Sequence, residues 1–180
     1  MWPFKKARPD ERKLTTAALK ARWFPAIVPE GHAGLDVFEQ AISEEERRRL
    51  PQTLAKLADN GVQRIHHVRK VDLAPDRGGV AYLDEMLSPA VRESLLWNQR
   101  PDDPQNLFRK VVTEFGAILG ELYVRGGKGR WDPRRAPNLW RSEIVSGGGG
   151  RCNPFDAVLR QLSDEHEEGA LLAHYDRFGA

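Results

Sequence analysis

The chain lacks features that several classes of protein require. It has a single cysteine, Cys152, in 180 residues, so an internal disulfide scaffold is excluded. No apolar run approaches the roughly 20 residues that cross a bilayer, and the most apolar stretch, 115–120, is bounded by Glu114 and Glu121. No apolar segment follows the basic N-terminus, which argues against a secretory signal. We therefore expect a cytoplasmic protein with no membrane partner.

The composition is that of a folded chain. Hydrophobic residues make up 40% of the sequence and charged residues 30%, which is too apolar and too nearly neutral for a wholly disordered protein. The length suits one domain with a sizeable core. We expect a single globular domain over residues 23–180, preceded by a basic and flexible N-terminal arm over residues 1–22.

The small net charge of +2 hides an uneven distribution of charged residues. Residues 1–22 and 125–151 each carry seven Lys or Arg and two Asp or Glu, a net charge of +5 apiece, which leaves −8 for the rest of the chain. Two basic segments on an acidic body suggest an anionic partner. A solvated tail and a solvated loop would explain the same pattern. The sequence leaves open whether the two segments lie on one face.

Apolar spacing and capping residues predict a long helix in the first half of the chain. Ser43 and Glu46 have the spacing of a capping box, and residues 60–61, Asn-Gly, predict the end of the helix. Pro51 is expected to kink or split it. Residues 62–73 fit a helix or a strand, and their Val and Ile content favours a strand.

Helix starts are also marked later in the chain, where a capping side chain precedes a proline. These starts are Ser88-Pro89, Asp103-Pro104 and Asn153-Pro154. We expect helices from about residues 80, 89, 104 and 154, and a last helix capped by Ser163. Two glycines inside the helix from 104, Gly116 and Gly120, indicate that another element approaches closely.

Residues 128–152 change in character. Tryptophans and prolines surround four consecutive glycines at 147–150, which predicts two or three short antiparallel strands with a glycine hairpin turn. The expected fold class is therefore α+β, a mostly helical single domain with a small antiparallel β-meander late in the chain.

This basic segment and the helix start after it supply the candidate binding residues. Tryptophan interleaved with arginine is used both by single-stranded nucleic-acid sites and by protein hot spots. Core packing covered by arginine stems gives the same pattern. Backbone N–H groups at a glycine loop and helix N-terminus favour anions, although no phosphate-loop motif is present. The candidate ligand-binding residues are Arg130, Trp131, Arg134, Arg135, Trp140, Arg141, Arg151 and Asn153.

The sequence offers no catalytic or metal-binding constellation. His66 and His67 are adjacent, and His166 and His174 are eight residues apart, so none of these pairs has the spacing of two ligands on one helix face. We expect no metal and no cofactor. Cys152 precedes a helix N-terminus, which can activate a thiol for a hydrolase-like reaction. A small buried residue beside a turn is the alternative role.

Three motifs in the second half of the chain resemble uncharacterised bacterial domains of unknown function. Residues 115–122 read FGAILGEL, residues 129–131 read GRW and residues 153–155 read NPF. In those domains a helix with a G-x-x-L-G-E core precedes a tryptophan-containing strand, a hairpin and an N-P-F helix start. The resemblance covers residues 104–178. It implies a bacterial, cytosolic α+β domain and transfers no catalytic residue.

These observations give three hypotheses for function. The first is a non-enzymatic protein-interaction or regulatory module with a protein partner. The second is a module that binds nucleic acid or a phosphate ligand through residues 1–22 and 125–151. The third is a hydrolase-like enzyme around Cys152.

Overall fold

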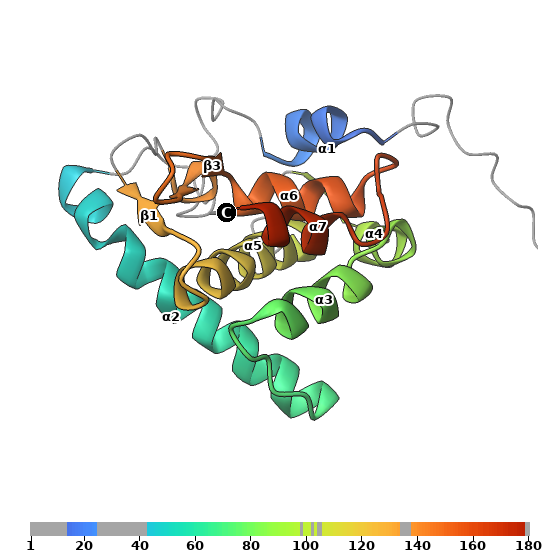
Figure 1. Ribbon diagram of the computed structural model, residues 1–180. Coiled ribbons are helices and arrows are strands. Elements are labelled where there is room, and N and C mark those ends of the chain that lie inside the picture. Colours follow the sequence, from blue (N-terminus) through green and yellow to red (C-terminus); the bar gives the residue numbers. More distant parts are fainter. Residues whose placement is uncertain are drawn as a thin grey trace, which may run out of the picture.

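The structure, a computed structural model, describes residues 14–24, 43–97, 99–101, 103, 106–133 and 138–178. In these parts of the chain seven α-helices accompany a small three-stranded antiparallel sheet late in the sequence (Figure 1), which confirms the expected mostly helical α+β fold. No helix in the described ranges is long and apolar enough to cross a membrane.

The helices and strands follow one another along the chain with the sheet placed between the fifth and sixth helices. The helices are α1 (Thr16–Trp23), α2 (Glu44–Arg69), α3 (Arg77–Met86), α4 (Pro89–Leu96), α5 (Leu107–Arg125), α6 (Pro154–Leu162) and α7 (Ala170–Arg177). The strands are β1 (Arg130–Asp132), β2 (Glu143–Val145) and β3 (Arg151–Cys152), in the order β1-β2-β3, with a 3-10 turn, η3 (Leu139–Arg141), before β2.

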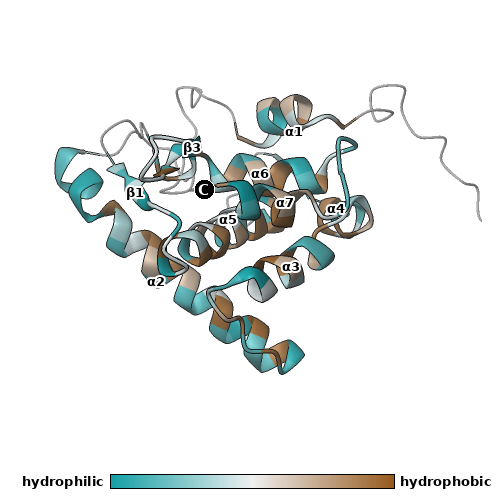
Figure 2. Ribbon diagram, in the orientation of Figure 1, coloured by the Kyte–Doolittle hydropathy of each residue, from teal (hydrophilic) through white to brown (hydrophobic). Residues whose placement is uncertain are grey.

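Helix α5 is the centre of the fold, and α2, α3, α4, α6 and the sheet pack around it. Figure 2 shows apolar residues gathered on α5 and α6, whereas α2 begins with hydrophilic turns. The two glycines of α5 confirm the predicted close approach. A Cβ on Gly116 would lie 2.2 Å from Cδ1 of Phe155, and one on Gly120 would lie 2.1 Å from Cζ2 of Trp131. These positions therefore let α6 and β1 reach the backbone of α5.

Helix α2 is longer than the sequence predicts. The capping box of Ser43 and Glu46 is confirmed, but the helix continues through Pro51 and past residues 60–61 as far as Arg69. The strand prediction for residues 62–73 is therefore wrong. Burial of the inward face of α2 against α5 favours the helix more strongly than Val and Ile content favours a strand.

The ends of the other helices show which of the predicted capping residues are confirmed. Ser88 caps α4 and Asn153 caps α6, as predicted. The helix expected from 104 begins at residue 107 instead, because Asn106 rather than Asp103 accepts the capping hydrogen bond, from Arg109 N–H. Ser163 ends α6 rather than capping the last helix, since its hydroxyl donates back to the carbonyl of Arg160.

Part of the segment expected to be an arm is folded onto the body. Residues 14–22 include most of α1, which packs on α6 with Leu19 fully buried. Leu14 and Asp164 also exchange two hydrogen bonds, because Leu14 N–H donates to the side-chain Oδ2 of Asp164 at 2.6 Å and Asp164 N–H donates to the Leu14 carbonyl at 2.9 Å. Residues 1–13 lie outside the described part of the chain.

Candidate functional site

The two tryptophans among the candidate binding residues are part of the core. Trp131 is 6% exposed and Trp140 is 1% exposed. The indole N–H of Trp131 donates to Glu121 Oε1 at 2.8 Å, and its ring lies against Phe155. Neither ring presents a free face on which a base or a partner side chain could stack, so core packing accounts for these two positions.

The described parts of the two basic segments each place one basic side chain against Trp140. Nζ of Lys20, from the first segment, lies 5.4 Å from the Trp140 ring centroid, and the guanidinium of Arg141, from the second, lies 4.9 Å from it. Much of the charge nearby is balanced, because Lys20 pairs with Asp156 at 2.7 Å. Within the described residues, one lysine of the first segment and one arginine of the second therefore share this ring, and the lysine is neutralised by its ion pair.

The remaining candidate residues divide between structural roles and exposed positions. Arg151 joins two strands through ion pairs of 2.7 Å each with Asp132 and Glu143. The side chain of Asn153 caps α6 and donates to the Trp140 carbonyl, so it already has partners at this helix start. Arg130 is exposed on β1, and Arg134 and Arg135 lie outside the described residues.

The surroundings of the Cys152 thiol disfavour its ionisation to the thiolate. It is buried, and burial raises its pKa to about 12, with the negative charges of Asp156 and Glu143 acting in the same direction. A thiol in this environment stays protonated near neutral pH and is a poor nucleophile. The hydrolase hypothesis therefore loses its physical basis at this residue. Within the described ranges, no group of three or more His, Cys, Asp or Glu residues is arranged to hold a metal ion.

An exposed aromatic residue that the sequence analysis missed lies at the end of α4. Trp97 is 75% exposed, the highest value among the large hydrophobic residues that the structure describes. Leu107 is 47% exposed, and its N–H donates at 2.8 Å to the side chain of Gln99, which follows Trp97 by two residues. The inward side of α4 is held by the buried Arg92, which pairs with Asp164 at 2.6 Å. The exposed indole is therefore attached to a firmly packed helix.

Trp97 shares its side of α4 with small and polar residues. Ala90, Glu93, Ser94 and Trp97 recur at the spacing of one helix face and line a shallow hollow of about 420 Å³. We call these four residues the Trp97 face. A signal in the sequence could have revealed it, because the residues three and four positions before Trp97 are Ser94 and Glu93. An aromatic side chain on the polar face of a helix has no core to enter.

Comparison of the chain with protein-family models, with curated proteins and with solved structures finds no match. The fold of the described residues is that of a mostly helical α+β domain with a small antiparallel sheet. A fold of this kind does not determine an activity, because the activity depends on the residues at a site and not on the fold.

Proposed function

We propose that this protein is a non-enzymatic protein-interaction module and that the Trp97 face is its contact surface. The observation that carries the proposal is the 75% exposure of Trp97 at the end of a helix that packs on the core through the buried Arg92 and the partly buried Val91 and Leu95. Tryptophan is enriched at the centres of protein interfaces, where burial of its large ring supplies much of the binding free energy. The free, buried thiol of Cys152 suits a reducing compartment, and we place the module in the cytoplasm.

The occupant that this face fits is a second copy of the chain. The Trp97 face carries an exposed indole and a shallow hollow that Ala90, Glu93, Ser94 and the indole itself line, so the indole of a second copy can enter it. Two α4 helices packed antiparallel about a two-fold axis between residues 93 and 94 would place Trp97 of each copy over Ala90 of the other. The same axis would bring the Ser94 side chains of the two copies together, and their hydroxyls can hydrogen-bond to each other.

The size of the face sets the strength of this contact. Helix α4 has eight residues and is about 12 Å long. A face of this length cannot supply the ~800 Å² per partner of a stable interface. We therefore expect a reversible dimer with a Kd on the order of 0.1 mM.

Substitution of Trp97 by alanine tests this proposal. Sedimentation equilibrium over a range of concentrations is expected to show reversible dimers for the natural chain and only monomers for Trp97→Ala. The matched control is Val68→Ala, which removes another exposed apolar side chain, 67% exposed on α2, and is expected to dimerise like the natural chain. A natural chain that stays monomeric at millimolar concentration, or a Trp97→Ala variant that dimerises equally well, would contradict the proposal.

The other two hypotheses have less support. Binding of nucleic acid or a phosphate ligand through the two basic segments is favoured by the two basic side chains that lie against Trp140, but Lys20 and Arg151 already have carboxylate partners. A phosphate group can pair with Lys20 or Arg151 only after the existing ion pairs of these residues are broken. An enzyme around Cys152 would need a thiolate, which the raised pKa of this buried thiol disfavours.

A further inference from the structure

A larger groove lies between α6 and α7, and none of the residues that line it belongs to the Trp97 face. Its volume is about 570 Å³, and Thr16 of α1 and Arg151 of β3 lie at its edges. Small side chains, including Ala157 on α6 and Ala173 on α7, leave space between the two helices. The groove is large enough for a small organic molecule.

A buried polar atom of Gln161, a residue that lines the groove, lacks a partner. Gln161 is 1% exposed, and its side-chain N–H groups donate to the carboxylate of Asp84 and, at 3.2 Å, to the carbonyl of Glu167. Because both of these partners are acceptors, they fix the orientation of the amide. Oε1 of Gln161 is then left buried with no hydrogen-bond partner among the residues that the structure describes. This atom has almost no accessible surface, so a donor in the groove reaches it only when a neighbouring side chain moves, and the cost of leaving the acceptor unpaired favours that movement.

His174 contributes a donor to the same groove. Nδ1 of its ring lies 2.7 Å from the hydroxyl of Tyr123. Burial raises the pKa of Tyr123 well above its usual range and lowers the pKa of His174, so the phenol keeps its proton and the imidazole is neutral near pH 7. The Tyr123 hydroxyl therefore donates to Nδ1, and the ring proton of His174 is carried on Nε2.

The charges along the groove are of both signs. Arg177, on the last turn of α7, has no acidic partner within the described ranges, and its Nε donates to the Ala173 carbonyl at 3.1 Å. Three carboxylates also line the groove, Glu165, Glu167 and Asp156, the last of which is paired with Lys20. Arg160 lies 3.5 Å from Glu167, at the edge of ion-pair distance. A ligand that carries both a negative and a positive group would match this distribution.

We propose that the groove binds a small amino carboxylate such as a free amino acid. The carboxylate would accept from Nε2 of His174 and from the guanidinium of Arg177, which has donors left after its contact with Ala173. The ammonium would lie beside Glu165 and Glu167, and after the side-chain movement that uncovers it Oε1 of Gln161 would accept a hydrogen bond from the ammonium. A simple carboxylate or inorganic phosphate would leave Gln161 Oε1 unpaired and would bind more weakly.

The test is an NMR titration of the isotope-labelled chain with the proteinogenic amino acids, and with acetate, methylammonium and inorganic phosphate as single-group probes. At least one amino acid is expected to shift amide resonances of α6 and α7 and to bind more tightly than every single-group probe. Arg177→Met is expected to weaken that binding by ~10-fold or more. Ala173→Phe, which fills the groove, should abolish it.

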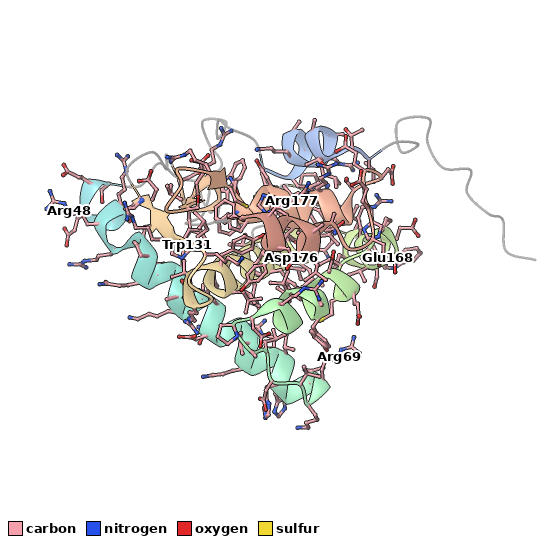
Figure 3. All side chains as sticks on the ribbon, in the orientation of Figure 1. Arg48, Arg69, Trp131, Glu168, Asp176 and Arg177 are labelled. Atoms are coloured by element: carbon pink, nitrogen blue, oxygen red, sulfur yellow. The ribbon has the colours of Figure 1, made fainter. Side chains whose placement is uncertain are left out.

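Arg69→Met is the matched control, because Arg69 lies at the far end of α2 in Figure 3, away from Arg177. This variant and Trp97→Ala are expected to bind the amino acid like the natural chain, which separates the groove from the proposed dimer contact. The proposal is overturned if no amino acid binds at millimolar concentration. It is also overturned if acetate or phosphate binds as tightly, or if Arg177→Met and Ala173→Phe leave binding unchanged in spectra that show a folded chain.

Discussion

Replacement of Gly120 by alanine is expected to lower the free energy of unfolding by about 3 kcal/mol. An alanine inside a helix would ordinarily stabilise it by ~1 kcal/mol relative to glycine. Here the new Cβ would lie 2.1 Å from Cζ2 and 2.2 Å from Cη2 of Trp131. The indole has little room to retreat, because its N–H is bonded to Glu121 and its other face meets Phe155.

Urea unfolding followed by circular dichroism measures this effect. The matched control is Gly147→Ala, since a Cβ at Gly147 meets no heavy atom within 4 Å, and its effect should stay within ~0.5 kcal/mol. If Gly120→Ala were as stable as the natural chain, the close packing of β1 on α5 would be wrong.

Replacement of Asp164 by alanine is expected to cost about 2 kcal/mol. Its carboxylate is the close partner of Arg92, at 2.6 Å, and the Arg92 side chain is only 7% exposed. Removal of the carboxylate leaves a buried cation without this partner, which costs ~3–5 kcal/mol in fully buried pairs. The cost is smaller here because Asp164 is itself 36% exposed and solvent screens the pair.

The same pair predicts how stability depends on pH. The hydrogen bond from Arg92 lowers the pKa of Asp164, and the backbone N–H of Leu14 acts in the same direction. The stabilisation is therefore present above the unfolded-state pKa of ~3.9 and is lost as the pH falls through the lower folded-state pKa. Asp164→Ala should lose less stability than the natural chain between neutral pH and about pH 3.

Asp176→Ala provides the control for this substitution. Asp176 also pairs with an arginine, Arg77, at 3.2 Å, but that arginine is 66% exposed. The loss at Asp176 should be at most ~1 kcal/mol, because water replaces the lost partner. Equal losses for the two variants would show that burial of Arg92 does not determine the energy of its ion pair.

The sequence predicted the helix caps of this fold better than it predicted contacts between segments that are distant in the sequence. Ser43, Ser88 and Asn153 cap helices as expected, because a cap is set by side chains within three residues of it. The two glycines of α5 correctly indicated close packing. The second half of α2 was mistaken for a strand, since its helical state depends on α5, which is distant in the sequence.

The predictions about the site depended on burial, which composition does not show. Trp131 and Trp140 attracted attention as aromatic residues beside arginines, yet both side chains are buried. Trp97 has no arginine directly beside it in the sequence, and its side chain is exposed. The unpaired Oε1 of Gln161 could not be foreseen, because it results from Asp84 and Glu167 meeting one amide in space.

Disulfide trapping tests the proposed contact of the Trp97 face most directly. In the antiparallel arrangement the two-fold axis passes beside residue 94, so Ser94→Cys places two thiols next to each other, while the buried Cys152 does not compete. Mild oxidation is expected to give covalent dimers of Ser94→Cys, and far fewer when Trp97→Ala is added. Cross-linking no greater than that of Arg69→Cys, a cysteine placed on α2 away from the face, would contradict the account.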